Sequence, residues 1–170
     1  MKQLILAALL FCCSVSFAQT NSFPATWTGN WKGKLTWTRT DTSTVTPMEL
    51  RIQPGDSAGV YTWHIIYGQG NKDSRPYLLK PGKSKSHWVL DELNEIKIDM
   101  YYLSQRLSCS FTVGKVTIVN HYWMQGDKLI AEFYTYTADA VSTTGKGTED
   151  VPTVKSYGLR SYQRAELTRN

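Results

Sequence analysis

Cysteine is scarce in this 170-residue chain, and two of the three cysteines, Cys12 and Cys13, lie in an N-terminal apolar stretch. Removal of that stretch would leave Cys109 alone, which excludes an internal disulfide. The fold must then be held together by its hydrophobic core. Cys109 alternates at period two with Leu107 and Phe111, and this pattern predicts a buried, inert thiol rather than a reactive one.

The N-terminus has the organisation of a secretory signal peptide. A single lysine precedes an apolar run that is too short to span a bilayer comfortably, and the run ends in small residues at Ala18. We therefore expect cleavage after Ala18, removal of residues 1–18, and one domain over residues 19–170 in a secreted or periplasmic protein without a membrane span. Lipid attachment at Cys12 is the alternative, but it requires a small residue where Phe11 stands.

The three-to-four-residue apolar rhythm of an amphipathic helix is also absent. Alternation at period two recurs instead nearly from end to end, most clearly in IKIDMYY over residues 96–102, and predicts an all-β protein. Counting gives about eight to ten strands with hairpin-length connections, which predicts a single antiparallel up-and-down β-barrel, because closing a sheet removes its edges. A membrane barrel would need an apolar outward band, whereas the outward positions here are Lys, Thr, Ser, Asp and Glu.

One segment near the C-terminus lacks any period. From Ala138 to Lys155 the chain is polar and rich in Thr and Gly, which predicts a long loop. Loops of this length in a compact domain are usually either functional lids or disordered segments, and both interpretations stay open. A last strand is expected from Tyr157 to Thr168.

Motifs for catalysis and metal binding are missing. The chain has no Ser or Cys nucleophile motif and no Gly-rich phosphate loop. His64, His87 and His121 are scattered without metal-site spacing, so neither a metal nor a cofactor is expected, with a histidine-ligated haem as the alternative. The acidic cluster beginning at Asp91 is interpreted as a solvated turn, and the basic stretch over residues 75–87 as a solvated hairpin. The net charge of +5 is spread along the chain and gives no indication of a nucleic-acid partner.

The start of the domain, FPATWTGNWKGKLTW, resembles the opening of calycins, in which a glycine and a tryptophan two residues later begin the first strand. Here these residues are Gly29 and Trp31. The resemblance to this superfamily, which includes the lipocalins, implies a lipocalin-like barrel in which Trp31 packs across the closed end beneath an arginine from near the end of the chain. Arg160 or Arg164 would be that arginine. Two lipocalin features are missing: a helix before the last strand, and a second signature near the sequence FYTYTADA.

The last predicted strand, GLRSYQRAEL, resembles the final strand of fatty-acid-binding proteins. That resemblance implies that Arg160 and Tyr162 point inward and hold a ligand carboxylate, since a guanidinium pairs a carboxylate bidentately. The alternation disagrees, because Leu159, Ala165 and Leu167 share the opposite face. A structural or surface arginine is therefore the alternative. The two covering helices of that family are also replaced here by the short connection TRTDTSTVTP.

The predicted inward face is rich in aromatic residues, which either line a pocket or fill a packed core, because cavity volume cannot be read from composition. We expect an exported carrier or sensor that holds a small apolar molecule of the fatty-acid or lipid kind, with no catalytic residues. Two alternatives stay open: a barrel enzyme acting on a lipid-like substrate through Arg160 or His121, and an interaction module with a filled interior. The expected ligand-binding residues are Trp37, Tyr61, Trp63, Met100, Tyr102, Phe111, Asn120, Tyr122, Phe133, Arg160 and Tyr162.

Overall fold

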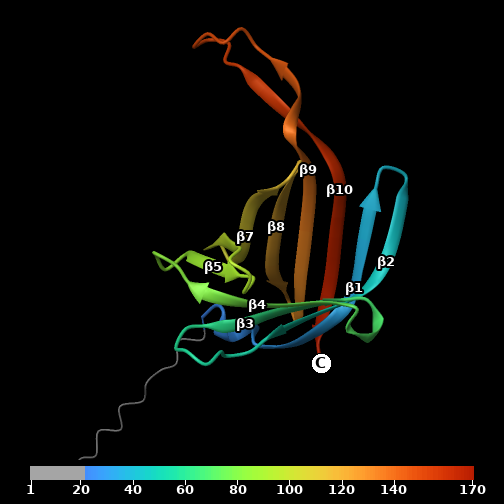
Figure 1. Ribbon diagram of the computed structural model, residues 1–170, viewed down its shortest axis with the longest axis vertical. Helices are drawn as coiled ribbons and strands as arrows, with labels where there is room; N and C mark the ends of the chain where they lie inside the picture. Colours follow the sequence, from blue (N-terminus) through green and yellow to red (C-terminus); the bar gives the residue numbers. More distant parts are fainter. Residues whose placement is uncertain (1–21) are drawn as a thin grey trace, which may run out of the picture.

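The computed structural model describes residues 22–170, apart from the side chain of Asn71, and shows ten antiparallel strands closed into one barrel (Figure 1). Each strand pairs with its neighbours along the chain, and β1 pairs with β10 to close the sheet. This arrangement confirms the predicted all-β up-and-down barrel, at the upper end of the expected strand number. The predicted signal peptide, residues 1–18 with cleavage after Ala18, lies outside the described residues.

The strands are β1 (Gly29–Arg39), β2 (Thr42–Ile52), β3 (Tyr61–Tyr67), β4 (Asp73–Pro81), β5 (His87–Asp91), β6 (Lys97–Leu103), β7 (Arg106–Val113), β8 (Val116–Gln125), β9 (Lys128–Thr144) and β10 (Val154–Arg169). Two single-turn 3-10 helices accompany them, η1 (Ala25–Trp27) before β1 and η2 (Gln69–Asn71) between β3 and β4. Within residues 22–170, we find no helix with the length and hydrophobicity needed to cross a membrane.

Period-two alternation decides which side chains enter the barrel. In β1, Trp31 and Leu35 are buried, while Lys32 and Lys34 are exposed. Gly33 lies between them, and a Cβ atom there would stand 2.0 Å from the carbonyl oxygen of Glu166 on β10. A glycine is therefore required at this point, because the backbones of β1 and β10 approach too closely for any side chain.

One end of the barrel is closed by the N-terminal residues of the described chain. The Trp31 indole donates a hydrogen bond to the Trp27 carbonyl oxygen at 2.8 Å, and Phe23 stacks on Tyr102 with ring centroids 4.2 Å apart. The guanidinium of Arg169 lies 4.6 Å from the centroid of the Trp31 ring. The tryptophan-and-arginine arrangement implied by the calycin resemblance is thus present.

The arginine over Trp31 is not one of the two expected. The pairing of β1 with β10 sets Arg169 opposite Trp31, so it reaches the ring from the very end of the strand. Arg164 is paired five positions further along, opposite Thr36, and its side chain bonds to Glu132. The expectation of Arg160 or Arg164 was therefore wrong, because it did not fix the register between the first and last strands.

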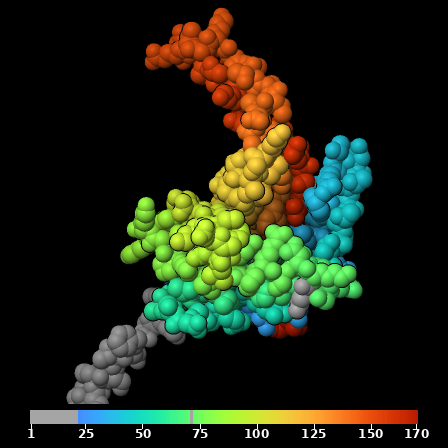
Figure 2. Space-filling view, viewed as in Figure 1, coloured from blue at the N-terminus to red at the C-terminus, as the bar shows by residue number. Residues whose placement is uncertain are grey.

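Only half of the segment from Ala138 to Lys155 is a loop, which corrects the sequence prediction. β9 continues to Thr144 and β10 begins at Val154, so the unpaired turn covers only residues 145–153. The hairpin beyond the barrel, residues 138–160 with the turn included, is here called the arm, and it projects well past the rim (Figures 1 and 2). Its strands pair with each other while most of its side chains are exposed, and for this reason no apolar alternation marked it in the sequence.

Candidate functional site

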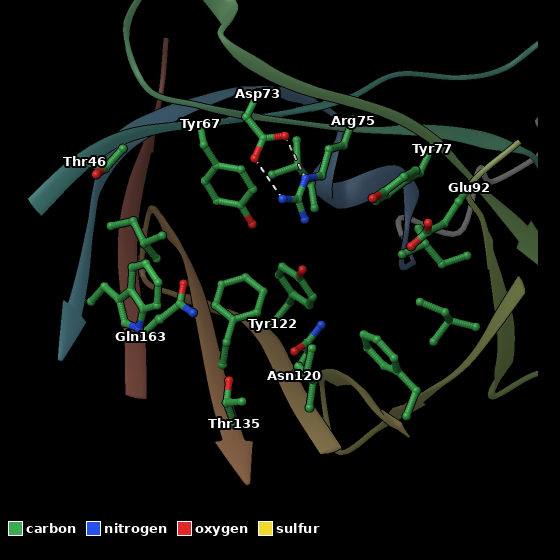
Figure 3. A pocket seen from close by; sticks show the side chains of 18 residues that line it. Thr46, Tyr67, Asp73, Arg75, Tyr77, Glu92, Asn120, Tyr122, Thr135 and Gln163 are labelled. Atoms are coloured by element: carbon green, nitrogen blue, oxygen red, sulfur yellow. Dashed lines mark hydrogen bonds and ion pairs between the residues drawn. The ribbon is translucent and has the colours of Figure 1, made fainter. Parts of the chain in front are cut away.

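A cavity of about 390 Å³ occupies the open end of the barrel (Figure 3). Five hairpins meet at this end, namely those joining β1 to β2, β3 to β4, β5 to β6, β7 to β8 and β9 to β10. The volume lies in the range of small-molecule sites, about 300 to 1,000 Å³. The apolar and aromatic part of its wall is formed by Leu35, Trp37, Ile65, Tyr67, Tyr77, Leu90, Ile98, Phe111, Ile118, Tyr122 and Phe133.

The floor of the cavity is a set of aromatic rings held edge to face. Tyr122 meets Trp63 with ring centroids 5.1 Å apart and Phe133 at 5.7 Å, both nearly perpendicular. Burial raises the pKa of Tyr122 well above its ordinary value, so its hydroxyl stays protonated. Beneath this floor, Met100, Leu107 and their neighbours are buried in the hydrophobic core. The interior is thus open above Tyr122 and packed below it.

Asn120 places a carboxamide in the wall at mid-depth. Its side chain is nine-tenths buried and points toward the cavity beside Tyr122 (Figure 3). The Oδ1 atom is buried and has no hydrogen-bond partner within residues 22–170. A buried amide oxygen without a partner costs about 1 to 3 kcal/mol of folding free energy. A bound molecule that donates a hydrogen bond to this oxygen would offset that cost.

The mouth of the cavity carries an ion pair. Arg75 on β4 donates from Nε to Asp73 Oδ1 at 2.9 Å and from Nη2 to Asp73 Oδ2 at 2.8 Å, and its guanidinium lies over the ring of Tyr67 (Figure 3). The hydrogen bonds that Arg75 donates to Asp73 lower the pKa of the Asp73 carboxyl and raise the pKa of the Arg75 guanidinium, so both groups stay charged. Burial raises the pKa of Tyr67 to about 12.

A second carboxylate, Glu92, lies beside Tyr77, which stands between Glu92 and Arg75 (Figure 3). Burial raises the pKa of Tyr77, and the charge of the neighbouring Glu92 raises it further. Glu92 has no ion-pair partner among the described residues. The three charged side chains of the wall, Asp73, Arg75 and Glu92, therefore sum to one negative charge.

Most of the expected ligand-binding residues are placed inside the barrel, at two levels. Trp37, Phe111, Asn120, Tyr122 and Phe133 line the cavity. Those in the filled part or packed against it are Tyr61, Trp63, Met100 and Tyr102. The inward direction predicted by period two was thus right for all nine, and four of them are core residues that do not line the cavity.

Arg160 and Tyr162 do not form a carboxylate clamp in the cavity. Tyr162 lies outside the barrel, where its hydroxyl donates to Glu132 Oε1 at 2.6 Å, and Arg164 donates to the same oxygen at 2.8 Å. Arg160 is exposed on the arm, next to irregular pairing between Leu159 and Ser161. Gln163 is the residue of this stretch that lines the cavity. The argument from alternation, which put Arg160 and Tyr162 on the outer face, was therefore correct, and the resemblance to the fatty-acid-binding strand was misleading here.

The charged residues of the mouth were missed by sequence reasoning. Arg75 was assigned to a solvated hairpin, although Asp73, Arg75 and Tyr77 alternate at period two and continue the same strand. Glu92 was assigned to a solvated turn. The signal that could have found Arg75 was its period-two alternation with Asp73 and Tyr77. The turn residues just before Asp73 obscured that alternation.

The histidines lie away from the cavity. His64 bonds to Ser74 at 2.7 Å, His121 bonds to Ser108 at 2.9 Å, and His87 accepts from the Lys83 backbone N–H and bonds to Asp99 at 2.8 Å. Among residues 22–170 there is no group of three His, Cys, Asp or Glu side chains that could hold a metal ion. Cys109 is buried as predicted, and burial raises its pKa to about 12.

Comparison with known proteins identifies a shared fold and no family. No family model matches the chain, and no curated protein matches it. Among solved structures, it is similar to a protein of unknown function from the DUF3598 family of Nostoc punctiforme, with a TM-score of 0.59 and 15% identity. The match covers 84% of this chain and 47% of that protein, so the chain spans about half of its relative's length.

Proposed function

We propose that this protein is an exported binding protein that holds one small, largely apolar molecule in the open end of its barrel. The observation that carries this proposal is the cavity itself, closed below by Tyr122 and walled by aromatic rings. A packed core would have continued to the rim, as it does at the other end. Small-molecule sites are typically apolar pockets with a few placed polar groups, and Asn120 supplies such a group.

The cavity favours binding over catalysis. Of its two acidic residues, Asp73 and Glu92, Asp73 is held in a bidentate pair with Arg75, which leaves it poorly suited to proton transfer. The two residues considered for an enzymatic role, Arg160 and His121, lie outside the cavity wall. An interaction module with a filled interior is likewise disfavoured by the open volume above Tyr122.

The experiment is calorimetric titration of residues 19–170 with decanol, a neutral probe with an apolar chain. Ile118→Trp would place an indole in the cavity, and Val119→Trp would place one on the outer face of the same strand, β8. We expect saturable one-to-one binding by the native protein and by Val119→Trp, and none by Ile118→Trp. Equal binding by all three proteins, or by none, would overturn the proposal.

A further inference from the structure

The charge of the cavity mouth indicates what kind of polar group the bound molecule carries. This inference rests on the proposed function and concerns the same cavity. The fatty-acid resemblance implied a carboxylate held by an inward arginine, but the arginine it pointed to lies on the arm. Any preference for an anion would therefore have to come from Arg75.

Arg75 is already paired with a carboxylate of the protein, that of Asp73. Its Nε and Nη2 atoms donate to the two oxygens of Asp73 at 2.9 and 2.8 Å, which is the geometry a ligand carboxylate would otherwise take. A second carboxylate at this place would lie next to Asp73 and would be repelled by it. Arg75 thus offers little binding energy to an anion unless Asp73 is displaced.

Glu92 is the uncompensated charge of the wall. No cation of residues 22–170 pairs with it, and it faces the cavity beside the ring of Tyr77 (Figure 3). A carboxylate beside a tyrosine favours an ammonium group, because the negative charge and the quadrupole of the ring both attract a cation. The same wall carries a buried oxygen in need of a donor, Asn120 Oδ1.

We propose that the molecule bound in this cavity is a cationic amphiphile, an aliphatic or aromatic amine whose ammonium group lies between Glu92 and Tyr77 while its apolar part fills the space above Tyr122. Leu90 and Ile98, which are paired across β5 and β6, line the same cavity as Glu92 and would offer apolar contacts to the chain of the amine. A donor group further along the molecule would meet Asn120.

The test compares three ligands of equal chain length and different head group: decylammonium, decanol and decanoate. Calorimetry at pH 7 on residues 19–170 is expected to show about tenfold tighter binding of decylammonium than of decanol, with decanoate weakest, which corresponds to about 1.4 kcal/mol. Glu92→Gln is expected to remove the preference, so that the variant binds decylammonium and decanol with similar affinity. Glu95→Gln, an exposed neighbour in the same hairpin that does not line the cavity, is the matched control and should keep the preference.

The outcomes separate this inference from the proposed function. Saturable decanol binding without any advantage for decylammonium, or with decanoate tightest, would overturn the cationic assignment and leave the binding role standing. An amine preference that survives Glu92→Gln would overturn it too, because another group would then be responsible. Absence of binding by all three ligands would overturn both.

Discussion

The two ends of the barrel are built from the same ten strands and differ in what fills them. At the closed end, Trp31 is 1% exposed, donates a hydrogen bond to Trp27 and lies beneath Arg169. At the open end, Trp37, six residues along the same strand and on the same face, is 36% exposed and lines the cavity. One strand therefore contributes a fully buried tryptophan and a partly exposed one, whose ring centroid lies 3.8 Å from the Arg39 guanidinium carbon. The open volume is thus a local property of the rim.

The largest difference between the ends should appear in stability. Trp31→Ala is expected to lower the free energy of unfolding by about 3 to 5 kcal/mol, because it removes a fully buried ring and leaves a void. Trp37→Ala is expected to cost about 1 kcal/mol or less, since its ring is already in contact with solvent. Urea unfolding of both variants measures the two costs, and similar values would contradict the distinction between a packed and an open end.

The reactivity of the Cys109 thiol measures how deep the open part of the barrel extends. It pairs with Asn120 across β7 and β8 but does not line the cavity. Because burial raises its pKa from 9.0 to about 12, its thiolate fraction at neutral pH should be about a thousandfold below that of a free cysteine. We expect iodoacetamide to leave the native protein unlabelled for hours and to label it readily in urea. Rapid native labelling would show that the opening reaches deeper than Asn120.

Asn120→Leu should stabilise the open end of the barrel, whereas the tryptophan substitutions destabilise the protein. Leucine has a similar size and removes the buried oxygen that has no partner, so the unliganded protein is expected to become about 1 kcal/mol more stable. Binding of amine or alcohol probes should weaken at the same time. Thermal unfolding with and without probe measures both effects. A loss of stability in the absence of probe would show that the carboxamide is needed for the fold.

The smallest expected difference is between the stability costs of removing two ion-paired carboxylates, Glu49 and Asp73. Hydrogen bonds from their arginine partners lower the folded-state pKa of both Glu49 and Asp73. Each ion pair therefore stabilises the fold at pH values above the ordinary carboxyl pKa, and this stabilisation is lost as the pH falls through the folded-state pKa. The Glu49 side chain is 16% exposed and that of Asp73 is 47% exposed. We expect Glu49→Gln to cost more at pH 7 than Asp73→Asn, each about 1 kcal/mol or less, with both costs lost as the pH falls below the lowered pKa values. The reverse order at pH 7 would contradict this ranking.

The sequence predicted the barrel well and the cavity only in part. Alternation at period two is a local property, so it placed Trp63, Phe111 and Tyr122 inside correctly. Which of these residues line open space depends on how side chains from distant strands meet, and this has no local signal. Register across the β1 and β10 seam is likewise a long-range property, and the arginine over Trp31 was misassigned for that reason.

The arm shows a second limit of sequence reasoning. Its strands are paired through the backbone from Ser142 with Ser156 out to Thr144 with Val154, yet both faces meet solvent. A strand with no buried face has no alternation to detect, so a polar, Thr-rich segment was indistinguishable from a loop. The same reasoning explains why Arg75 and Glu92, polar residues on an inward face near solvent, were assigned to the surface.

The open end of the barrel is proposed to hold a small molecule. Native mass spectrometry of the protein isolated from the organism that makes it, compared with a denatured sample, tests this most directly. We predict one bound small molecule that is lost on denaturation, retained by Val119→Trp and absent from Ile118→Trp. A native mass equal to the denatured mass, or an adduct carried equally by Ile118→Trp, would contradict the account.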